Sequence, residues 1–333
     1  MSNLNIEQVF TKIDEATKAV EYHKNEPYLD SLSIVLEWLL FKESNGEEDE
    51  ILVRKLKTSL KEIHIDKLPK DQLKKVTELL ILKGMKDSVQ AQHLLTPETI
   101  ALFISYLVNK LFSKGPIRVF DPVCGTANLL TTVLKELNTS YEAFGSEIDP
   151  TLLRLAVNHA NLLEMEIEFF HQDSLRPFLL DPVDLVIADL PVGYYPDDMI
   201  AQNYELRANE GHSYAHHLLI EQSLNYTKDG GYLIFLIPEF LFDSDQAQQL
   251  NRFLHKSAHI VGVLRLPEDA FRSEKQVKSI FILQKKGVET KAPHQPLLVM
   301  LPSLNNSKAM ENILVQINDW FEKYKENSKG IGE

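Results

Sequence analysis

The chain has 333 residues, of which 44% are hydrophobic, so it can bury one large core or a main domain with appendages. Its net charge of −13 argues against non-specific adhesion to nucleic acid, which depends on a basic surface, and its single cysteine, Cys124, excludes an internal disulfide or a thiolate zinc site. The first residues lack a signal-peptide pattern, and no segment reaches the roughly 18 apolar residues that span a bilayer, so we expect a cytoplasmic protein without membrane contact.

The charge is unevenly distributed along the chain. Residues 87–250 carry 8 Lys and Arg against 23 Asp and Glu, whereas 51–86 carry 10 against 4 and 251–300 carry 9 against 4. A polyanion such as DNA or RNA would have to contact the basic flanks at 51–86 and 251–286. The alternative interpretation is that both flanks are solvated faces of helices and hairpins.

Residues 1–86 are predicted to form a helical N-terminal domain. Apolar residues recur there at helical spacing, as at Leu32, Val35 and Leu39, and Gly and Pro are scarce.

Residues 87–287 show short apolar runs, rich in β-branched and aromatic residues, that alternate with amphipathic helices. This alternation is typical of α/β proteins with βα units around a mostly parallel sheet, and nearly continuous apolar runs indicate strands buried on both faces. The last two strands are joined by PEDAFRSEKQV, which has weak helical character, so we expect an antiparallel hairpin that closes one edge. The predicted strands are 118–123, 142–148, 167–173, 183–190, 231–237, 260–266 and 278–286.

Residues 288–333 are predicted to add a strand, LLVML, and a helix that both pack on this core. We interpret the apolar stripe of the helix as core and not as a ligand-binding surface. The stripe consists of Met310, Ile313, Leu314, Ile317, Trp320, Phe321 and Tyr324.

The first candidate site follows the first strand of this sheet, at its carboxyl end, where ligands bind in doubly wound sheets. The strand runs through DPVCGTAN, residues 121–128, into a helix. Gly125 lacks the neighbouring glycines that let a pyrophosphate approach a helix N-terminus, so a nicotinamide or flavin enzyme is disfavoured. The turn still suits a ligand with a small zwitterionic end. Cys124 is expected to be buried and not to act as a nucleophile.

Acidic residues also end the next two strands. Glu147 ends the second strand, where a carboxylate can accept hydrogen bonds from both hydroxyls of a ribose while Ile148 lies against an adenine face. Asp173 follows the third strand and can accept a hydrogen bond from an exocyclic amine. A single acid at such a position is more often a helix cap. Acids at three successive strand ends favour a ligand site.

Two segments resemble class I S-adenosylmethionine-dependent methyltransferases of the N6-adenine type, seen in the methylation subunits of type I restriction-modification systems. DPVCGTANLL is similar to the family's D-P-x-C-G-T-G-x-x-L cofactor loop, with Ala127 at the last glycine, and HLLTPETIALFISYLV is similar to its F-x-T-P segment. The resemblance covers roughly residues 88–287, and within the family the chain resembles the small bacterial YtxK-like proteins.

This resemblance implies a Rossmann-like, doubly wound methyltransferase sheet that binds S-adenosylmethionine. It implies that Glu147 holds the ribose and Asp173 the adenine, and that the helix after Thr96-Pro97 covers the methionine end. The residues predicted to bind the cofactor are Thr96, Pro97, Asp121, Pro122, Cys124, Gly125, Thr126, Asn128, Glu147, Ile148, Asp173 and Ser174.

The family's fourth motif, (N/D/S)-P-P-(Y/F), corresponds to Asp189-Leu190-Pro191-Val192. In the family, a side-chain acceptor and a backbone carbonyl take the two hydrogens of a planar amine, and an aromatic ring stacks on the extruded base. Asp189, the Leu190 carbonyl and Pro191 match this motif, but Leu190 replaces a proline and Val192 replaces the aromatic residue. Tyr194 or Tyr195 restores a stacking face if the loop turns back. The alternative is that both tyrosines pack or hydrogen-bond at a boundary between domains.

Three functions therefore stay open. The protein methylates an amine in nucleic acid, with adenine N6 as the leading choice, or it methylates a protein side-chain amide such as that of glutamine. In the third hypothesis it binds the cofactor, has lost methyl transfer and acts as an interaction protein.

Three histidines are candidates for a metal site. His212 and His216 are predicted to share a helix face, and His217 is adjacent to them. Acids at ligand spacing are missing nearby, so we predict no metal site there.

Overall fold

The computed structural model describes residues 5–42, 49–87, 95–271 and 277–329. Residues 93–94 of the predicted threonine-proline segment and 272–276 of the predicted hairpin connection lie outside this part. The helices are α1 (Ile6–Lys24), α2 (Tyr28–Phe41), α3 (Glu50–Ser59), α4 (Lys70–Asp87), α5 (Glu98–Leu111), α6 (Asn128–Glu136), α7 (Pro150–Leu163), α8 (Asp198–Ala201), α9 (Ala215–Asn225), α10 (Ala247–Ser257) and α11 (Ser307–Lys329), with short 3₁₀ turns at Ile65–Lys67, Glu239–Phe242 and Glu268–Ala270. The strands are β1 (Ile117–Asp121), β2 (Tyr141–Glu147), β3 (Glu168–His171), β4 (Val183–Asp189), β5 (Thr227–Pro238), β6 (Ala258–Arg265), β7 (Lys278–Lys285) and β8 (Leu297–Met300).

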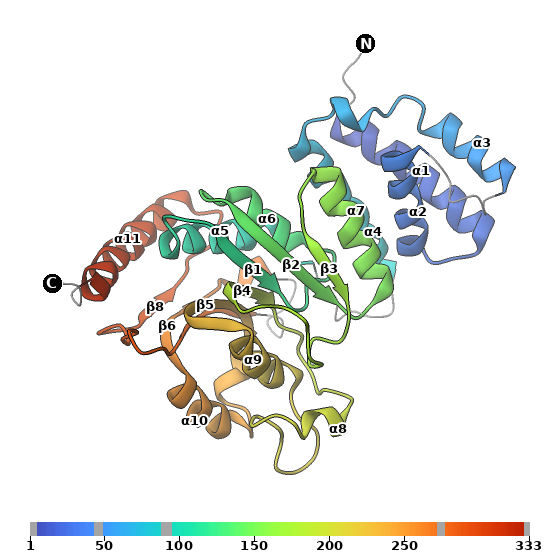
Figure 1. Cartoon of the computed structure of the whole chain (residues 1–333). Helices are drawn as coiled ribbons and strands as arrows, with labels where there is room; N and C mark the ends of the chain where they lie inside the picture. Colours follow the sequence, from blue (N-terminus) through green and yellow to red (C-terminus); the bar gives the residue numbers. More distant parts are fainter. Residues whose placement is uncertain (1–4, 43–48, 88–94, 272–276, 330–333) are drawn as a thin grey trace.

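These strands form one sheet in the order β3-β2-β1-β4-β5-β7-β6-β8. Figure 1 shows this sheet, with all of its strands except β7 labelled. The strands from β3 to β5 are parallel, and β7 is antiparallel to both β5 and β6. The predicted α/β fold and its antiparallel hairpin are confirmed. The hairpin does not close the edge, however, because β8 lies beyond it and pairs with β6 in parallel. Gly262 makes this pairing possible, since a Cβ atom there would lie only 2.9 Å from the Leu297 carbonyl oxygen.

The central strands are buried on both faces of the sheet. In β4, Leu185 and Ile187 pack in one apolar cluster, whereas Val186 and Ala188 pack in the other. Helices α5, α6 and α11 contribute to the first cluster, and α9 and α10 to the second (Figure 1). The side chains of a strand point alternately to opposite faces, so burial on both sides requires the nearly continuous apolar sequence of these strands.

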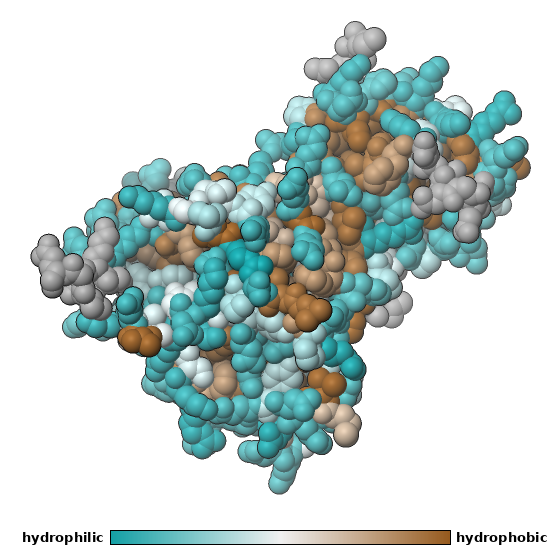
Figure 2. All heavy atoms as spheres, in the orientation of Figure 1, coloured by the Kyte–Doolittle hydropathy of each residue, from teal (hydrophilic) through white to brown (hydrophobic). Residues whose placement is uncertain are grey.

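Helices α1 to α4 have an apolar cluster of their own that includes Leu155 and Leu162 of α7. Helix α7 also forms polar contacts with α2: the Arg154 guanidinium donates two hydrogen bonds of 2.5 Å to the Glu37 carboxylate, and the Asn158 amide donates to the Ser33 carbonyl at 3.2 Å. The face shown in Figure 2 is mainly hydrophilic, with hydrophobic side chains visible at the N-terminal helices and also in the middle of the molecule. Helix α7 therefore joins the N-terminal helices to the sheet.

A buried ion pair forms a second connection. The Lys74 ammonium on α4 lies 2.6 Å from the Glu78 carboxylate and 3.2 Å from that of Glu98, the first residue of α5. The side chains of Lys74 and Glu78 are each only 4% exposed. Two charges taken out of water are tolerated only as partners, so loss of one leaves the other uncompensated.

We expect Lys74→Ala to lower the free energy of unfolding by about 3 kcal/mol, because it leaves Glu78 buried without its main partner. Urea unfolding followed by circular dichroism measures this change. Lys256→Ala is the matched control, since its ion pair with Glu205 is exposed at both ends and should contribute little. Equal losses in the two variants would contradict the assignment of a buried pair.

Candidate functional site

Three acidic residues lie at one edge of the sheet. Asp121, Glu147 and Asp189 are the last residues of β1, β2 and β4, which are adjacent and parallel. Burial raises the pKa of Asp121 well above its ordinary value, and the negative charges of Glu147 and Asp189 add to this shift. The structure therefore brings together carboxylates that lie far apart in the sequence. We call this carboxyl-terminal edge of the parallel strands the rim.

The loop from Asp121 to Asn128 is fixed against Glu147. One oxygen of the Glu147 carboxylate accepts a hydrogen bond from the Gly125 N–H at 2.9 Å, and the other accepts the N–H groups of Ile148 and Asp149, both at 2.9 Å. Asp121 accepts the Val123 N–H at 3.1 Å. The loop and the second strand end are thus held in one fixed arrangement.

The rim has space and unpaired polar atoms beside this loop. A Cβ atom at Gly125, where φ is +54°, would meet no atom within 4 Å. Ile148 is 62% exposed, although it is a large apolar residue. Among the described residues, the buried Thr126 hydroxyl and the side-chain oxygen of Asn128 have no hydrogen-bond partner. Buried polar atoms are normally paired, so this arrangement fits a polar ligand with an apolar face, as a nucleoside cofactor has.

Ala127 adopts the left-handed conformation, with φ of +59°, at the position where the resembled loop has its last glycine. For a residue with a Cβ atom this conformation costs about 1–2 kcal/mol. The Ala127 side chain is fully buried in an apolar cluster, which offsets about 0.8 kcal/mol of that strain. Alanine is therefore compatible with the glycine conformation of this loop.

Other predicted cofactor residues hold the loop in place. The Ser174 hydroxyl donates to the Pro122 carbonyl, and the Cys124 N–H donates to the Ser146 carbonyl at 2.9 Å. Cys124 is buried, as expected, and burial raises the pKa of its thiol, which disfavours the thiolate. Pro97 precedes α5 as its N-cap residue.

Asp173 is placed beside the second strand end but is already engaged by its own chain. One carboxylate oxygen accepts the Leu175 N–H at 3.0 Å, and the other accepts the Tyr195 hydroxyl at 2.5 Å. Tyr195 is only 7% exposed. Tyr195 is therefore not an exposed stacking ring. Its side chain packs in the interior and hydrogen-bonds to Asp173.

The Asp189 carboxylate is held by two side chains from distant segments. The Thr96 hydroxyl donates to one of its oxygens at 2.9 Å, and the Lys278 ammonium donates to the other. The same Lys278 nitrogen lies 3.4 Å from the Leu190 carbonyl oxygen. The Asp189 side chain and the Leu190 carbonyl thus converge on one point, which the Lys278 ammonium occupies.

Sequence reasoning did not identify Lys278. It is the first residue of β7 and pairs with Pro238, the last residue of β5. Because β7 is antiparallel to β5, its amino end reaches the rim where the parallel strands end. The predicted hairpin could have indicated Lys278, because the second strand of a hairpin begins at the edge of the sheet where the first strand ends.

Three stacked rings, of Tyr194, Tyr214 and His216, form an aromatic ladder. The rings of Tyr194 and Tyr214 stack with centroids 4.8 Å apart and an interplanar angle of 16°, and Tyr214 stacks on His216 at 5.1 Å. Tyr194 is 57% exposed, so one end of the ladder faces solvent. Loop 190–194 therefore does present an aromatic face, although Val192 stands at the motif's aromatic position.

The predicted helix face shared by His212 and His216 does not form. Helix α9 begins at Ala215, so His212 precedes it and pairs instead with Asp198 at 3.0 Å, because the chain enters the helix from an extended segment at Tyr214. Burial lowers the pKa of His216 to about 3 and that of His217 to about 4, so both are neutral at pH 7. Within the described part of the chain, no group of three or more His, Cys, Asp or Glu side chains is arranged to hold a metal ion.

Many side chains of the two basic flanks take part in ion pairs. In 51–86, Lys70, Lys74, Lys75 and Lys83 pair with carboxylates. In 251–286, the same holds for Lys256, Arg265, Lys278 and Lys285. The flanks consequently offer less free positive charge than their composition indicates.

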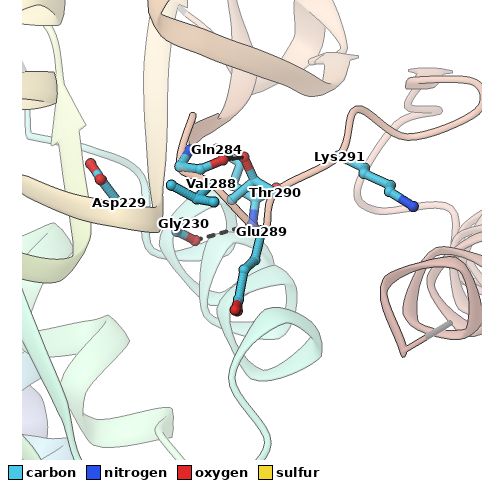
Figure 3. A pocket seen from close by; sticks show the side chains of 8 residues that line it. Asp229, Gly230, Gln284, Val288, Glu289, Thr290 and Lys291 are labelled. Carbon is cyan, nitrogen blue, oxygen red and sulfur yellow. Dashed lines mark hydrogen bonds between the residues drawn. The ribbon is translucent and has the colours of Figure 1, made fainter. Parts of the chain in front are cut away.

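Two surface hollows lie away from the rim. The one in Figure 3, of about 420 Å³, is formed by residues such as Gly230, Gln284 and Thr290, near the start of β5 and the end of β7. The other, of about 450 Å³, includes Arg118 and Phe178. Neither contains a predicted site residue. Among the described helices, none combines the length and apolarity needed to cross a bilayer.

Comparison with known families gave two matches. The profile of the N-6 DNA methylases matches residues 68–329, and that of the YtxK N-terminal helical domain matches residues 7–85.

Three individual proteins are similar to this chain to different degrees. The uncharacterized protein YtxK of Bacillus subtilis (strain 168) is 43% identical over 329 residues, which covers 98% of this chain and all of that protein. A Listeria monocytogenes crystal structure, described as a class I S-adenosylmethionine-dependent methyltransferase, is 38% identical with a TM-score of 0.88, covering 95% of this chain and 98% of that one. The EcoEI methylase subunit of a type I restriction enzyme from Escherichia coli is 22% identical over 231 residues, or 63% of this chain but only 46% of the subunit.

The raised pKa of Asp121 predicts a pH-dependent stability. In the unfolded chain this carboxyl has its ordinary pKa of 3.8, whereas the folded protein binds the proton more tightly, so stability falls as pH rises above about 4. Asp121→Asn removes this titration and keeps an oxygen for the Val123 N–H. We expect the unfolding free energy of the unaltered protein to fall, relative to that of the variant, as the pH rises from 4 to 8. A difference that stays constant over this range would contradict the assignment.

Proposed function

The chain belongs to the N-6 DNA methylase family, and on this premise we propose that it transfers a methyl group from S-adenosylmethionine to a planar NH₂ nitrogen. The observation that carries the proposal is that the Asp189 carboxylate and the Leu190 carbonyl, beside Asp121 and Glu147, lie close enough together to contact the same Lys278 nitrogen. An NH₂ nitrogen that takes the position of the Lys278 nitrogen would donate its two hydrogens to these two acceptors.

The cofactor is assigned to the loop between Asp121 and Asn128 and to the second strand end. Glu147 would bind the ribose and the exposed Ile148 would lie against the adenine, while Gly125 leaves room for a close approach of the ligand. The unpaired oxygens of Thr126 and Asn128 would take hydrogen bonds from its polar groups. When bound, the cofactor supplies an electrophilic methyl group on a sulfonium sulfur.

The protein's own residues prepare the target nitrogen. The lone pair of an aromatic amine or amide is delocalised, so the nitrogen is a weak nucleophile until both of its hydrogens are accepted. Thr96 fixes the Asp189 carboxylate, and Pro191 restricts the backbone that follows the Leu190 carbonyl. Such positioning supplies a large part of the rate in transfer reactions. Tyr194, at the exposed end of the aromatic ladder, would stack on the planar group of the substrate.

Adenine N6 in DNA or RNA is the first substrate candidate, because the family is that of the N-6 DNA methylases. Charge favours a second candidate, the side-chain amide of a protein glutamine. Residues 87–250 carry 8 Lys and Arg against 23 Asp and Glu, and several basic side chains of both flanks are paired with acids. An acidic surface repels a polyanion but not a protein segment.

We expect Gly125→Arg to abolish the binding of S-adenosylmethionine in isothermal titration and Glu147→Gln to weaken it about tenfold, the effect of one lost charge-assisted hydrogen bond. Gly115→Arg is the matched control. Gly115 also has a positive φ and open space around its Cβ position, but it precedes the opposite end of β1. Unchanged affinity in Gly125→Arg, or an equal loss in Gly115→Arg, would refute the assigned cofactor site.

We expect Asp189→Ala to reduce methyl transfer by about 100-fold, which is the order of effect when one positioned polar group is removed. Labelled cofactor is incubated with DNA, RNA and protein fractions of a cell extract, followed by nuclease or protease digestion. Asp184→Ala is the control, because Asp184 lies in the same strand with its own lysine partner, Lys228, at 2.7 Å. Label in nucleic acid supports adenine, and label in protein supports the amide. No label in any fraction would refute transfer and favour an interaction protein.

A further inference from the structure

Lys278 places a primary amine at the point where the two acceptors of the rim converge. Its nitrogen contacts the Asp189 carboxylate and lies 3.4 Å from the Leu190 carbonyl oxygen. Of the lysines in the described part of the chain, Lys278 is the one whose ammonium contacts Asp189. The protein's own side chain therefore occupies the position that a substrate nitrogen would take.

A chain of hydrogen bonds connects this amine to the loop assigned to the cofactor. The Thr96 hydroxyl donates to the Asp189 carboxylate at 2.9 Å, and the Asn128 amide donates to the Thr96 carbonyl at 2.8 Å. Asn128 is the last residue of that loop, and Asp121, its first residue, ends the strand beside the one that Asp189 ends. The same strand ends therefore hold the Lys278 amine and the proposed cofactor site.

The Lys278 nitrogen becomes a nucleophile when it loses one proton, because an ammonium has three N–H groups and no lone pair. The side chains of Lys278 and Asp189 are each 20% exposed, so water reaches the ion pair and can take this proton. The neutral amine keeps two hydrogens, one for the Asp189 carboxylate and one for the Leu190 carbonyl. Its lone pair then points away from both acceptors.

We propose that Lys278 is a self-methylation site, whose nitrogen accepts the methyl group of bound S-adenosylmethionine when no substrate displaces it. This inference rests on the proposed function, which delivers a methyl group to a nitrogen at this point. The lone pair of the neutral amine forms the new N–C bond. The C–S bond breaks and its electron pair stays on sulfur, so the products are S-adenosylhomocysteine and a methylammonium.

The two acceptors limit the product to one methyl group. The methylammonium has two hydrogens left, and the Asp189 carboxylate and the Leu190 carbonyl accept one each. A second transfer would replace one of these hydrogens and leave an acceptor without its partner, which is unfavourable for a partly buried polar group. Methylation keeps the positive charge of the side chain, so the ion pair with Asp189 persists.

The test incubates the full-length protein, without any substrate, with S-adenosylmethionine that carries a deuterated methyl group. Peptide mass spectrometry after digestion counts labelled methyl groups together with unlabelled ones added during expression. Lys278→Arg removes the amine, Asp189→Ala removes the acceptor that holds it, and Gly125→Arg blocks the assigned cofactor loop. Lys256, an exposed lysine of α10 with its own partner Glu205 at 2.9 Å, is the internal control.

We expect one methyl group on Lys278, at least about 100-fold more often than on Lys256, because a reactant held in place reacts as if it were highly concentrated. The Asp189→Ala and Gly125→Arg variants should lose this modification, and Lys278→Arg should carry none in the same peptide. The result that overturns the inference is an unmodified Lys278 in the unaltered protein. Equal modification of Lys256, or modified Lys278 in Gly125→Arg, also overturns it, because the reaction would then not depend on the site.

Isothermal titration of the same proteins with S-adenosylmethionine separates this inference from the proposed function. If the unaltered protein binds the cofactor and Lys278 stays unmodified, only the self-methylation fails. If the unaltered protein does not bind the cofactor, the proposed function fails first.

Discussion

The parallel alignment of β2, β1 and β4 is the constraint on which the site depends. It brings the carboxylates of Glu147, Asp121 and Asp189 to one rim, where burial raises the pKa of Asp121 and repulsion from the charges of Glu147 and Asp189 raises it further. The surrounding structure offsets this repulsion with local hydrogen bonds. Backbone N–H groups bind Glu147 and Asp121, whereas Thr96 and Lys278 bind Asp189. These hydrogen bonds hold the carboxylates in a fixed arrangement that suits a ligand, although such an accumulation of charge is unfavourable for folding.

The N-terminal helices connect to this rim by two routes. The ion pair of Lys74 reaches Glu98, which follows the Thr96-Pro97 segment that contacts Asp189. Helix α7 forms the other route, because it packs on α2 and its His159 ring nitrogen lies 3.2 Å from the Thr126 carbonyl in the cofactor loop. The helical part is thus continuous with the site through hydrogen bonds and ion pairs as well as through apolar packing.

The chain departs from the family motif at Leu190 and Val192, and the structure shows what takes their place. Leu190 is fully buried among apolar residues, so its side chain fills core space while its carbonyl faces Lys278. An aromatic face is supplied two positions later, by Tyr194 stacked on Tyr214. Ala127 stands at the position of the family's glycine and adopts a left-handed conformation, which glycine favours.

The sequence by itself determined the alternation of strands and helices, the acids at the strand ends and the turn at residues 121–128. These features depend on periodicity and local turns, which neighbouring residues encode. The parallel order of the sheet then places the strand ends together. The tertiary structure alone decided the partners of those residues: the contact of Lys278 with Asp189 joins positions 89 residues apart, and that of Tyr195 with Asp173 removes one of two candidate stacking rings. The ion pairs of the basic flanks and the position of β8 beyond the hairpin were also decided by the tertiary structure. Contacts between distant segments depend on the packing of the whole chain and leave no periodic signal in any one segment.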